Sequence, residues 1–258
     1  MLRPMFAKRT ALVTGAASGI GLATARLLAE QGASRLILCD RDRAGLASAA
    51  GGLAGPELEL VPGDVADEAY WDHLGPALAG IDHAVINAGV AGSGAITTLD
   101  YAEWRRILAV NLDGAFLSLR AAMRAMEARQ SGGSIVLTAS AAGLKAEPGI
   151  AAYAASKAGV LQLARVAAKE GAANRIRVNT IAPGGVETPI WRETAFFNDL
   201  VAAKGSEAAA FAAMAGIATP LGRYATADEI AGQIAFLLSD ACATVTGTTF
   251  VSDGGYML

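Results

Sequence analysis

The segment Ala11–Gly21, ALVTGAASGIG, decides the fold that the rest of the chain adopts. Its first four residues are apolar or β-branched and predict a short buried strand, and glycines then stand at positions 15, 19 and 21. Apolar residues at Leu22, Ala25 and Leu28 continue the segment as a helix. A strand, a glycine turn and a helix start together predict a phosphate site, because glycine lets the backbone approach the anion and the first helical turn offers free N–H groups.

A second apolar strand runs from Arg35 to Cys39 and ends in Asp40. A carboxylate about twenty residues after a glycine turn bonds the ribose hydroxyls of an adenosine and repels a 2′-phosphate, so the sequence favours NAD over NADP. Arg41 and Arg43 leave NADP open, because a basic side chain at this point accommodates the 2′-phosphate. A plain β–α turn without a nucleotide remains the alternative for the glycine segment taken alone.

Further apolar runs predict an alternation of strands and helices along the whole chain. Strands are expected at 58–61, 81–86, 134–138, 176–181 and 248–251, and helices at 101–129, 150–171 and 226–238. This order predicts an α/β fold, a single Rossmann-type doubly wound parallel sheet of about seven strands with helices on both faces. We expect one dinucleotide-binding and catalytic domain over 1–258, with an irregular or loosely helical substrate lid at about 190–218.

Polar or small residues follow several predicted strands, at the edge where open α/β sheets bind ligands. Asp64 and Val65 follow the third strand and could meet the adenine, although an aspartate that caps the next helix fits the pattern nearly as well. The segment Asn87-Ala88-Gly89 follows the fourth strand, and its small residues would let a cofactor lie against the backbone. Asn111 interrupts an apolar helix, which indicates either a function or a kink.

Three residues near the middle of the chain suit proton transfer to or from an alcohol oxygen. Ser140 ends the fifth strand, and Tyr153 and Lys157 lie four apart, on one face of the helix that follows. A phenol with a pKa of about 10 is a poor base at neutral pH, but a nearby ammonium favours the phenolate and lowers that pKa. Ser140 could then orient the substrate oxygen by a hydrogen bond. A buried tyrosine beside a surface lysine is the alternative for the Tyr-x-x-x-Lys pair alone.

The composition excludes several other classes of protein. The chain has 258 residues, a formal net charge of −3 and no basic or acidic block, which argues against nucleic acid and anionic membranes as partners. The N-terminus shows no signal-peptide pattern and no stretch is apolar enough to span a membrane, so a cytoplasmic location is expected. Cys39 and Cys242 give no disulfide framework, and Cys39 is expected as a buried free thiol. His73 and His83 lack further ligands at suitable spacing, so no metal site is proposed.

Together these motifs resemble those of the short-chain dehydrogenase/reductase family, in its single-domain form, over nearly the whole chain. Ile86 is a small departure, since the family often has a second asparagine before Asn87. The matching residues fall in the family's order and spacing: Thr14-Gly15-x-x-x-Gly19-x-Gly21, Asp64, Asn87-Ala88-Gly89, Asn111, Ser140, Tyr153-x-x-x-Lys157 and Pro183-Gly184 with Thr188.

The resemblance implies a role for each matching residue. Tyr153 is the general acid/base, Lys157 lowers its pKa and bonds the nicotinamide ribose, and Ser140 polarises the substrate oxygen. Asn111 holds a water that relays protons between Lys157 and solvent, and the long helices around Asn111 and Tyr153 form an oligomer interface, in a homotetramer or a dimer. The implied cofactor contacts are Gly15, Ser18, Gly19, Ile20, Gly21, Asp40, Asp64, Val65, Asn87, Ala88, Gly89, Tyr153, Lys157, Pro183, Gly184, Val186 and Thr188.

The sequence therefore favours an NAD(H)-dependent oxidoreductase that interconverts a secondary alcohol and a ketone. One alternative is a 3-oxoacyl-[acyl-carrier-protein] reductase that uses NADPH, and it ranks second because Ser18 stands where such enzymes commonly have a basic residue. A non-catalytic dinucleotide-binding sensor is the alternative from another class.

The substrate is expected to contact Ser140, Tyr153 and Trp191. Trp191, Phe196 and Phe197 suggest an apolar wall and hence a cyclic, aromatic or medium aliphatic substrate. Glu147 and Arg192 could instead meet the hydroxyls or the carboxylate of a sugar derivative, and ordinary loop packing remains open for all five of these loop residues.

Overall fold

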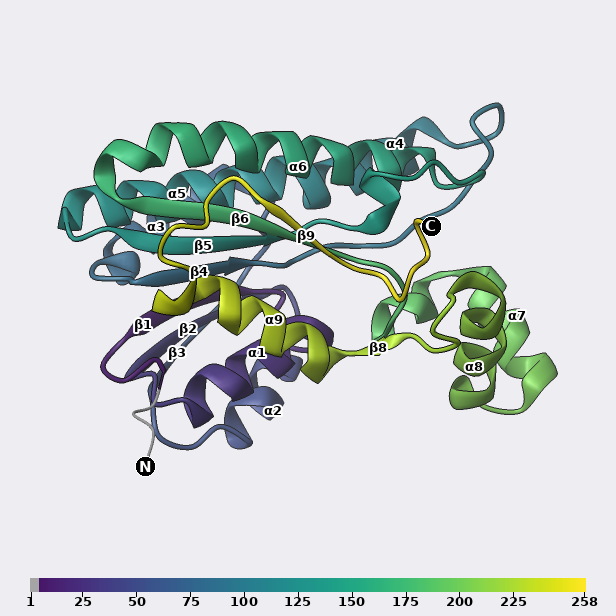
Figure 1. The fold of residues 1–258 in the computed structure, drawn as a ribbon, viewed down its shortest axis with the longest axis horizontal. Coiled ribbons are helices and arrows are strands. Elements are labelled where there is room, and N and C mark those ends of the chain that lie inside the picture. Colours follow the sequence, from purple (N-terminus) through teal and green to yellow (C-terminus); the bar gives the residue numbers. More distant parts are fainter. Residues whose placement is uncertain (1–4) are drawn as a thin grey trace.

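The computed structural model describes residues 5–258 and shows a parallel sheet of seven strands in the order β3-β2-β1-β4-β5-β6-β9 (Figure 1). All the pairings within this sheet are parallel, so the predicted α/β class and doubly wound sheet are confirmed. The first four residues of the expected domain, 1–4, lie outside the described part of the chain. The strands are β1 Thr10–Thr14, β2 Arg35–Asp40, β3 Glu57–Pro62, β4 His83–Ile86, β5 Gly133–Thr138, β6 Ile176–Pro183 and β9 Thr249–Ser252.

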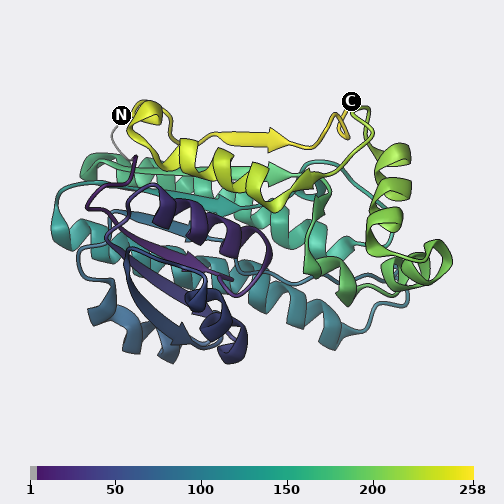
Figure 2. The same ribbon diagram turned by 90° about the horizontal axis from the view of Figure 1, so that it is seen from below.

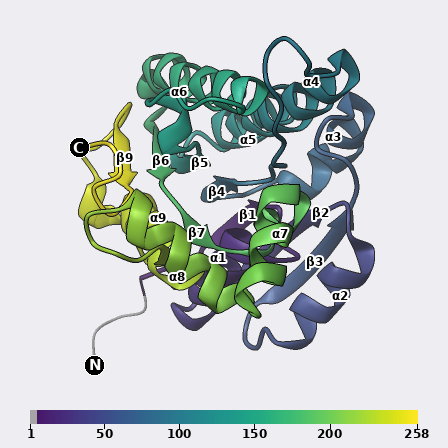
Figure 3. The same ribbon diagram turned by 90° about the vertical axis from the view of Figure 1, so that its right-hand side faces the viewer.

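Helices cover both faces of the sheet, and each face has its own apolar core (Figures 1 and 3). One face carries α3 (Glu68–Leu74), α5 (Gly114–Arg129) and α6 (Ala151–Gly171), with α4 (Tyr101–Leu108) at its end. The other carries α1 (Gly19–Glu30), α2 (Arg43–Gly51) and α9 (Ala227–Leu238). The central strands are buried on both sides because every second residue faces one of the two cores.

The predicted helix at 101–129 forms with one irregularity. It divides into α4, a π-helical turn at Ala109–Asp113 and α5, and Asn111 lies in that π turn. A π turn inserts an extra residue into a helix and is frequent at functional sites. The predicted interruption at Asn111 is therefore present as a local widening of the helix.

The segment expected as an irregular or loosely helical lid is more regular than the sequence suggested. It contains α7 (Ala195–Lys204) and α8 (Glu207–Ala218), which project from the end of the sheet that carries the C-termini of the strands (Figures 1 and 2). The short strands β7 (Val186–Glu187) and β8 (Ala225–Thr226) pair in parallel at the base of this projection. Alanine favours helix strongly, and the run of alanines in α8 outweighs the glycine at 216.

Within residues 5–258 no single helix is long and apolar enough to cross a membrane; only α7 and α8 taken together, with a bend of 109° between them, reach the necessary length and composition. Cys39 and Cys242 are both free and buried, as predicted for Cys39. No cluster of three metal-ligating side chains occurs among the described residues.

Candidate active site

A cavity with a volume of about 550 Å³ lies at the C-terminal edge of the sheet. It extends from the ends of β1, β2 and β3 to the start of α6 and the segment that precedes α7. Most of the residues predicted from the sequence line this one cavity: Gly15, Ser18, Gly19, Ile20, Asp40, Asp64, Val65, Asn87, Ala88, Gly89, Ser140, Tyr153, Lys157, Pro183, Gly184, Val186, Thr188 and Trp191. Gly21 and Asn111 lie behind this lining.

The glycine turn has the geometry of a phosphate cradle. Gly15 has a φ of +67°, and a Cβ added at Gly21 would lie 2.0 Å from the carbonyl oxygen of Gly15, so only glycine fits there. Ser18 is the N-cap residue of α1 and its side chain makes no capping hydrogen bond. The first N–H groups of α1 are therefore available to an anion at the positive end of the helix dipole.

Carboxylates dominate the end of the cavity where the adenosine is expected. Asp40 accepts hydrogen bonds from the backbone N–H groups of Ala17 and Asp42, each at 3.0 Å. Asp42 and Asp64 line the same region, while Arg41 is the cationic side chain there. Asp64 accepts a hydrogen bond from the N–H of Ala66 at 2.9 Å, and Asp67 rather than Asp64 is the N-cap of α3.

Two asparagines fix the loop after β4. Asn87 donates a side-chain hydrogen bond to the carbonyl of Thr14 at 3.2 Å, and the Thr14 hydroxyl accepts from the N–H of Asn87 at 2.9 Å, which ties β4 to β1. Asn111 is 1 % exposed; its amide accepts from the N–H of Val90 at 2.8 Å and donates to the Val90 carbonyl at 3.0 Å. The side chain of Asn111, in the π turn, therefore holds the loop after β4 through the N–H and the carbonyl of Val90.

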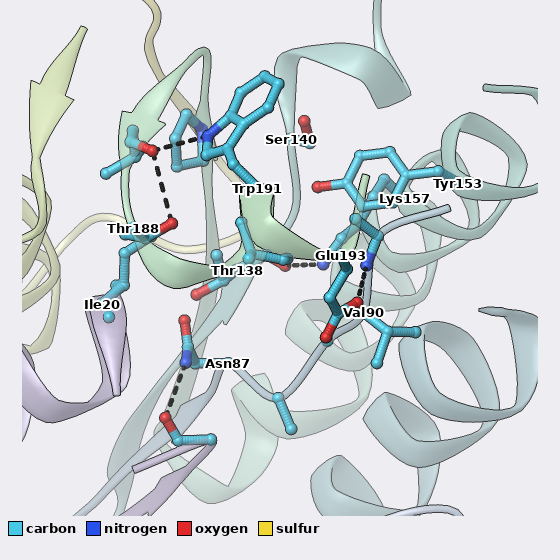
Figure 4. Close-up of a pocket in the computed structure, with 18 of the residues that line it drawn as sticks. Ile20, Asn87, Val90, Thr138, Ser140, Tyr153, Lys157, Thr188, Trp191 and Glu193 are labelled. Atoms are coloured by element: carbon cyan, nitrogen blue, oxygen red, sulfur yellow. Dashed lines mark hydrogen bonds between the residues drawn. The ribbon is translucent and has the colours of Figure 1, made fainter. Parts of the chain in front are cut away.

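Ser140, Tyr153 and Lys157 meet in the middle of the cavity (Figure 4). Ser140 follows β5, and its hydroxyl lies on the same side of the cavity as the phenol oxygen of Tyr153. Lys157 is 4 % exposed, donates to the carbonyl of Thr138 at 2.9 Å, and places its Nζ 5.8 Å from the centre of the Tyr153 ring. The predicted convergence of hydroxyl, phenol and ammonium is present in the structure.

Burial dominates the titration of these groups. It raises the pKa of the Tyr153 phenol, an effect that a hydrogen bond with Ser140 partly offsets. Burial also lowers the pKa of Lys157 to about 8. In this structure the Lys157 ammonium is hydrogen-bonded to the Thr138 carbonyl, and burial is the largest influence on the pKa of Tyr153.

The three aromatic residues expected to form a wall lie in three different environments. Trp191 lines the cavity, donates to the Val186 carbonyl at 2.9 Å and stacks on Tyr224 at 5.9 Å between ring centres. Phe197 is instead buried between α7 and α8, and Phe196 is 63 % exposed outside the cavity lining. Only the first of the three predicted aromatic residues therefore faces the cavity.

The two charged loop residues considered for a sugar-like substrate have partners elsewhere. Arg192 forms a two-pronged ion pair with Glu207, with contacts of 2.6 and 3.0 Å. Glu147 accepts a hydrogen bond from the hydroxyl of Tyr256 at 2.5 Å. Neither side chain lines the cavity.

Several lining residues were not singled out from the sequence, among them Glu193, Tyr224 and Tyr256. Glu193 accepts a hydrogen bond from the N–H of Ala91 at 3.1 Å, and Tyr224 and Tyr256 enter the cavity from the chain after the lid. The turn Asp253-Gly254-Gly255 immediately before Tyr256 is the signal that could have pointed to a tail folded back onto the sheet edge.

Comparison with known proteins shows which proteins this chain resembles. A family model described as Enoyl-(Acyl carrier protein) reductase matches residues 15–257. The chain is 43 % identical to a cis-4-hydroxycyclohexanecarboxylate dehydrogenase of Sinomonas cyclohexanicum, over 97 % of each chain. It is 36 % identical to a mitochondrial (-)-isopiperitenol/(-)-carveol dehydrogenase of Mentha piperita, over 96 % of this chain and 93 % of the relative.

A solved structure of levodione reductase superimposes with a TM-score of 0.86 and 34 % identity, covering 96 % of this chain and 97 % of the other. The fold and the full-length relatives define the class: the chain belongs to the short-chain dehydrogenase/reductase family. It is an NAD(P)-dependent dehydrogenase that acts on CH–OH donors.

Proposed function

We propose that this protein is an NAD(H)-dependent oxidoreductase that interconverts a secondary alcohol and a ketone, with Tyr153 as the general acid/base. The observation that carries the proposal is the meeting of the Ser140 hydroxyl, the Tyr153 phenol and the buried Lys157 ammonium in one cavity with the glycine cradle. A bound nicotinamide supplies the hydride acceptor or donor.

The residues present fit such a cofactor. The glycine cradle and the uncapped start of α1 suit the pyrophosphate, and Asp40 with Asp64-Val65 suits the adenosine. At the other end, the Thr138 hydroxyl is buried without a hydrogen-bond partner and lines the cavity beside Lys157. The remaining contacts would come from the segment Asn87-Ala88-Gly89, from Pro183 and Gly184, and from Val186 and Thr188.

In the oxidation direction, Tyr153 takes the proton of the substrate hydroxyl while Ser140 holds the substrate oxygen by a hydrogen bond. Burial alone would keep the phenol protonated, so the reaction depends on positive charge beside it. Lys157, with a pKa of about 8, is mostly protonated at neutral pH and supplies that charge. A Cβ atom built on Gly89 would lie 3.3 Å from the side-chain oxygen of Asn111 and 3.5 Å from Nζ of Lys157. The two polar groups are therefore close together, which supports a role for Asn111 in the proton relay.

Replacing Tyr153 by Phe tests the proposal. We expect turnover of alcohols to fall by a factor of about 10³ or more, because the acid/base is lost, while NADH binding stays within about twofold of the unaltered protein. The matched control is Tyr101→Phe, at a phenol that is 73 % exposed and outside the cavity lining. Retained turnover in the Tyr153 variant would refute the assignment.

The carboxylates at the adenosine end support NAD as the preferred cofactor. Asp40, Asp42 and Asp64 would repel a 2′-phosphate, and Arg41 is the cationic side chain that opposes them among the described residues that line this end of the cavity. Fluorescence titration of the purified protein with NADH and NADPH decides this, and we expect NADH to bind at least about tenfold more tightly, a difference of about 1.4 kcal/mol. Tighter NADPH binding together with turnover confined to acyl-carrier thioesters would favour the reductase alternative.

A homo-oligomer assembled through α5 and α6 completes the proposal. These helices lie side by side on the face of the sheet that also carries α3. Each leaves an apolar side chain exposed, Phe116 at 45 % on α5 and Val166 at 44 % on α6. A second copy of the chain would cover both.

A further inference from the structure

The part of the cavity beyond Ser140 and Tyr153 has a distinct lining, which we call the substrate end. It includes aromatic and apolar side chains from the turn after β5, the start of α6, the lid, the segment that follows the lid and the C-terminal tail. They are Ala142, Ile150, Trp191, Ala218, Tyr224 and Tyr256. Figure 4 shows Trp191 on the same side of the cavity as Ser140.

Positive charge is almost absent from this lining. Among the described residues that line the cavity, the only cationic side chains are Arg41 and Lys157. Arg41 lies at the adenosine end, with its guanidinium 4.0 Å from a carboxylate oxygen of Glu193. Lys157 is buried and bonded to Thr138. A substrate carboxylate at the substrate end would therefore lose its water without gaining a partner, which costs free energy.

The outer wall of the substrate end is Tyr256, and two charged side chains hold it in place. Its hydroxyl donates to Glu147 at 2.5 Å, and Lys145 donates to its carbonyl at 2.9 Å with the ammonium 4.0 Å from the centre of its ring. Lys145 and Glu147 are themselves 3.6 Å apart. The charges of Lys145 and Glu147 thus offset each other, and both side chains are hydrogen-bonded to Tyr256.

The tail that carries Tyr256 is a folded turn. The carboxylate of Asp253 accepts from the N–H groups of Gly255 and Met257 at 2.9 and 3.0 Å. Gly254 and Gly255 both have positive φ values, +65° and +89°, which side-chain-bearing residues rarely adopt. The sequence of the tail therefore fixes the direction in which the Tyr256 ring enters the cavity.

Building on the proposed function, we infer that the substrate is an uncharged, ring-containing secondary alcohol or ketone, and that Tyr256, positioned by Glu147 and Lys145, is a specificity-determining residue. The flat faces of Trp191, Tyr224 and Tyr256 suit an alicyclic or aromatic ring, and the absence of a free cation there disfavours an acid. The inference separates this chain from its 43 % identical relative, whose printed name includes a carboxylate on the cyclohexane ring.

A matched pair of substrates tests the charge. We expect kcat/KM for 4-methylcyclohexanol to exceed that for 4-hydroxycyclohexanecarboxylate at least about tenfold, since the two share a ring and differ in the charged group. Equal or higher kcat/KM for the carboxylate overturns the inference while leaving the proposed function intact. Absence of turnover for every alcohol and ketone, with NADH still bound, would instead refute the proposed function.

Variants in the tail test Tyr256. Tyr256→Ala should raise KM for 4-methylcyclohexanol about tenfold and improve kcat/KM for the bulkier 4-tert-butylcyclohexanol relative to it, because the wall is removed. Tyr256→Phe and Glu147→Gln, which keep the ring, should raise KM about threefold with kcat and NADH affinity unchanged. Leu258→Ala, in the same tail at a fully exposed side chain, is the control. An unchanged preference between the two alcohols in Tyr256→Ala would overturn the role of Tyr256.

Discussion

Asp40 both holds the backbone of the glycine turn and lines the cavity. Its two carboxylate oxygens each accept one backbone N–H, from Ala17 and Asp42, and the same side chain faces the adenosine end of the cavity. It therefore shapes the glycine turn and sets the local charge at the same time.

We expect Asp40→Asn to shift the cofactor preference towards NADP. The amide keeps the shape of the carboxylate but removes its charge, so the ratio of the NADPH and NADH dissociation constants should fall at least about tenfold. Fluorescence titration with both nucleotides measures this ratio. Glu57→Gln, an exposed carboxylate at the opposite end of β3, should leave the ratio unchanged. An unaltered ratio in Asp40→Asn would mean that the backbone sets the preference.

His83 makes stability depend on pH. It is 7 % exposed, its Nδ1 lies 2.8 Å from the Ser134 hydroxyl, and burial lowers its pKa from 6.5 to about 4. The unfolded chain therefore binds a proton between these values that the folded chain does not. Neutral His83 therefore contributes fully to the free energy of unfolding above pH 6.5, and this contribution is lost as the pH falls towards 4.

Between pH 7.5 and pH 5, His83 should account for a loss of about 2 kcal/mol in the free energy of unfolding. Urea unfolding at the two values measures the loss, and His83→Gln, which cannot titrate, should show a correspondingly smaller one. His73→Gln, at an exposed imidazole, is the control. Equal pH dependence in His83→Gln and the unaltered chain would contradict the prediction.

At the residue level, the sequence predicted the positions of the proton-transfer residues better than those of the residues that line the rest of the cavity. Ser140, Tyr153 and Lys157 could be placed because strand ends and helical spacing determine where they point. Glu193 and Tyr256 could not, since their positions depend on tertiary contacts with Ala91 and Glu147 that no local pattern encodes.

Among the elements, the π turn at Ala109–Asp113 has the clearest structural consequence. It directs Asn111 inward, where the side chain pairs with both backbone groups of Val90 and with the Ser156 hydroxyl at 3.2 Å. The turn thus joins the loop after β4 to α6.

Asn111→Ala should lower the free energy of unfolding by roughly 1–3 kcal/mol, because the buried backbone groups of Val90 lose their partners. It should also lower kcat, since the loop beside Lys157 is released. Urea unfolding and steady-state kinetics measure the two effects. Asn174→Ala, at an exposed asparagine, should change neither by a measurable amount. A stability loss below about 0.5 kcal/mol in Asn111→Ala would contradict this account.

The strands and long helices followed from the sequence because buried parallel strands are continuous apolar runs and their helices have a clear period. The lid was expected only as an irregular or loosely helical segment, since α8 is apolar on all sides and has no helical stripe to recognise. Its helices pack around a separate cluster that includes Phe197, Phe211 and Tyr224, so their apolar residues mark a small core of their own.

For the whole molecule, the exposed faces of α5 and α6 predict self-association. Light scattering coupled to size-exclusion chromatography should give a mass at least twice the 26.1 kDa of the chain. Val166→Glu should reduce that mass, because a charge would be buried at the interface. Ile217→Glu, at a side chain that is 92 % exposed on α8, should leave it unchanged. A monomeric mass for the unaltered protein would exclude the assembly.

The wall of the substrate end comes largely from the last third of the chain, through Trp191, Ala218, Tyr224 and Tyr256, whereas the glycine cradle and the proton-transfer residues precede it. The strands β7 and β8 pair where this last part leaves and rejoins the sheet edge. Mutations in the lid and tail can therefore alter which molecule enters while hydride transfer continues. After gene duplication, a protein with this architecture can therefore acquire a new substrate specificity by successive single substitutions, with every intermediate still active.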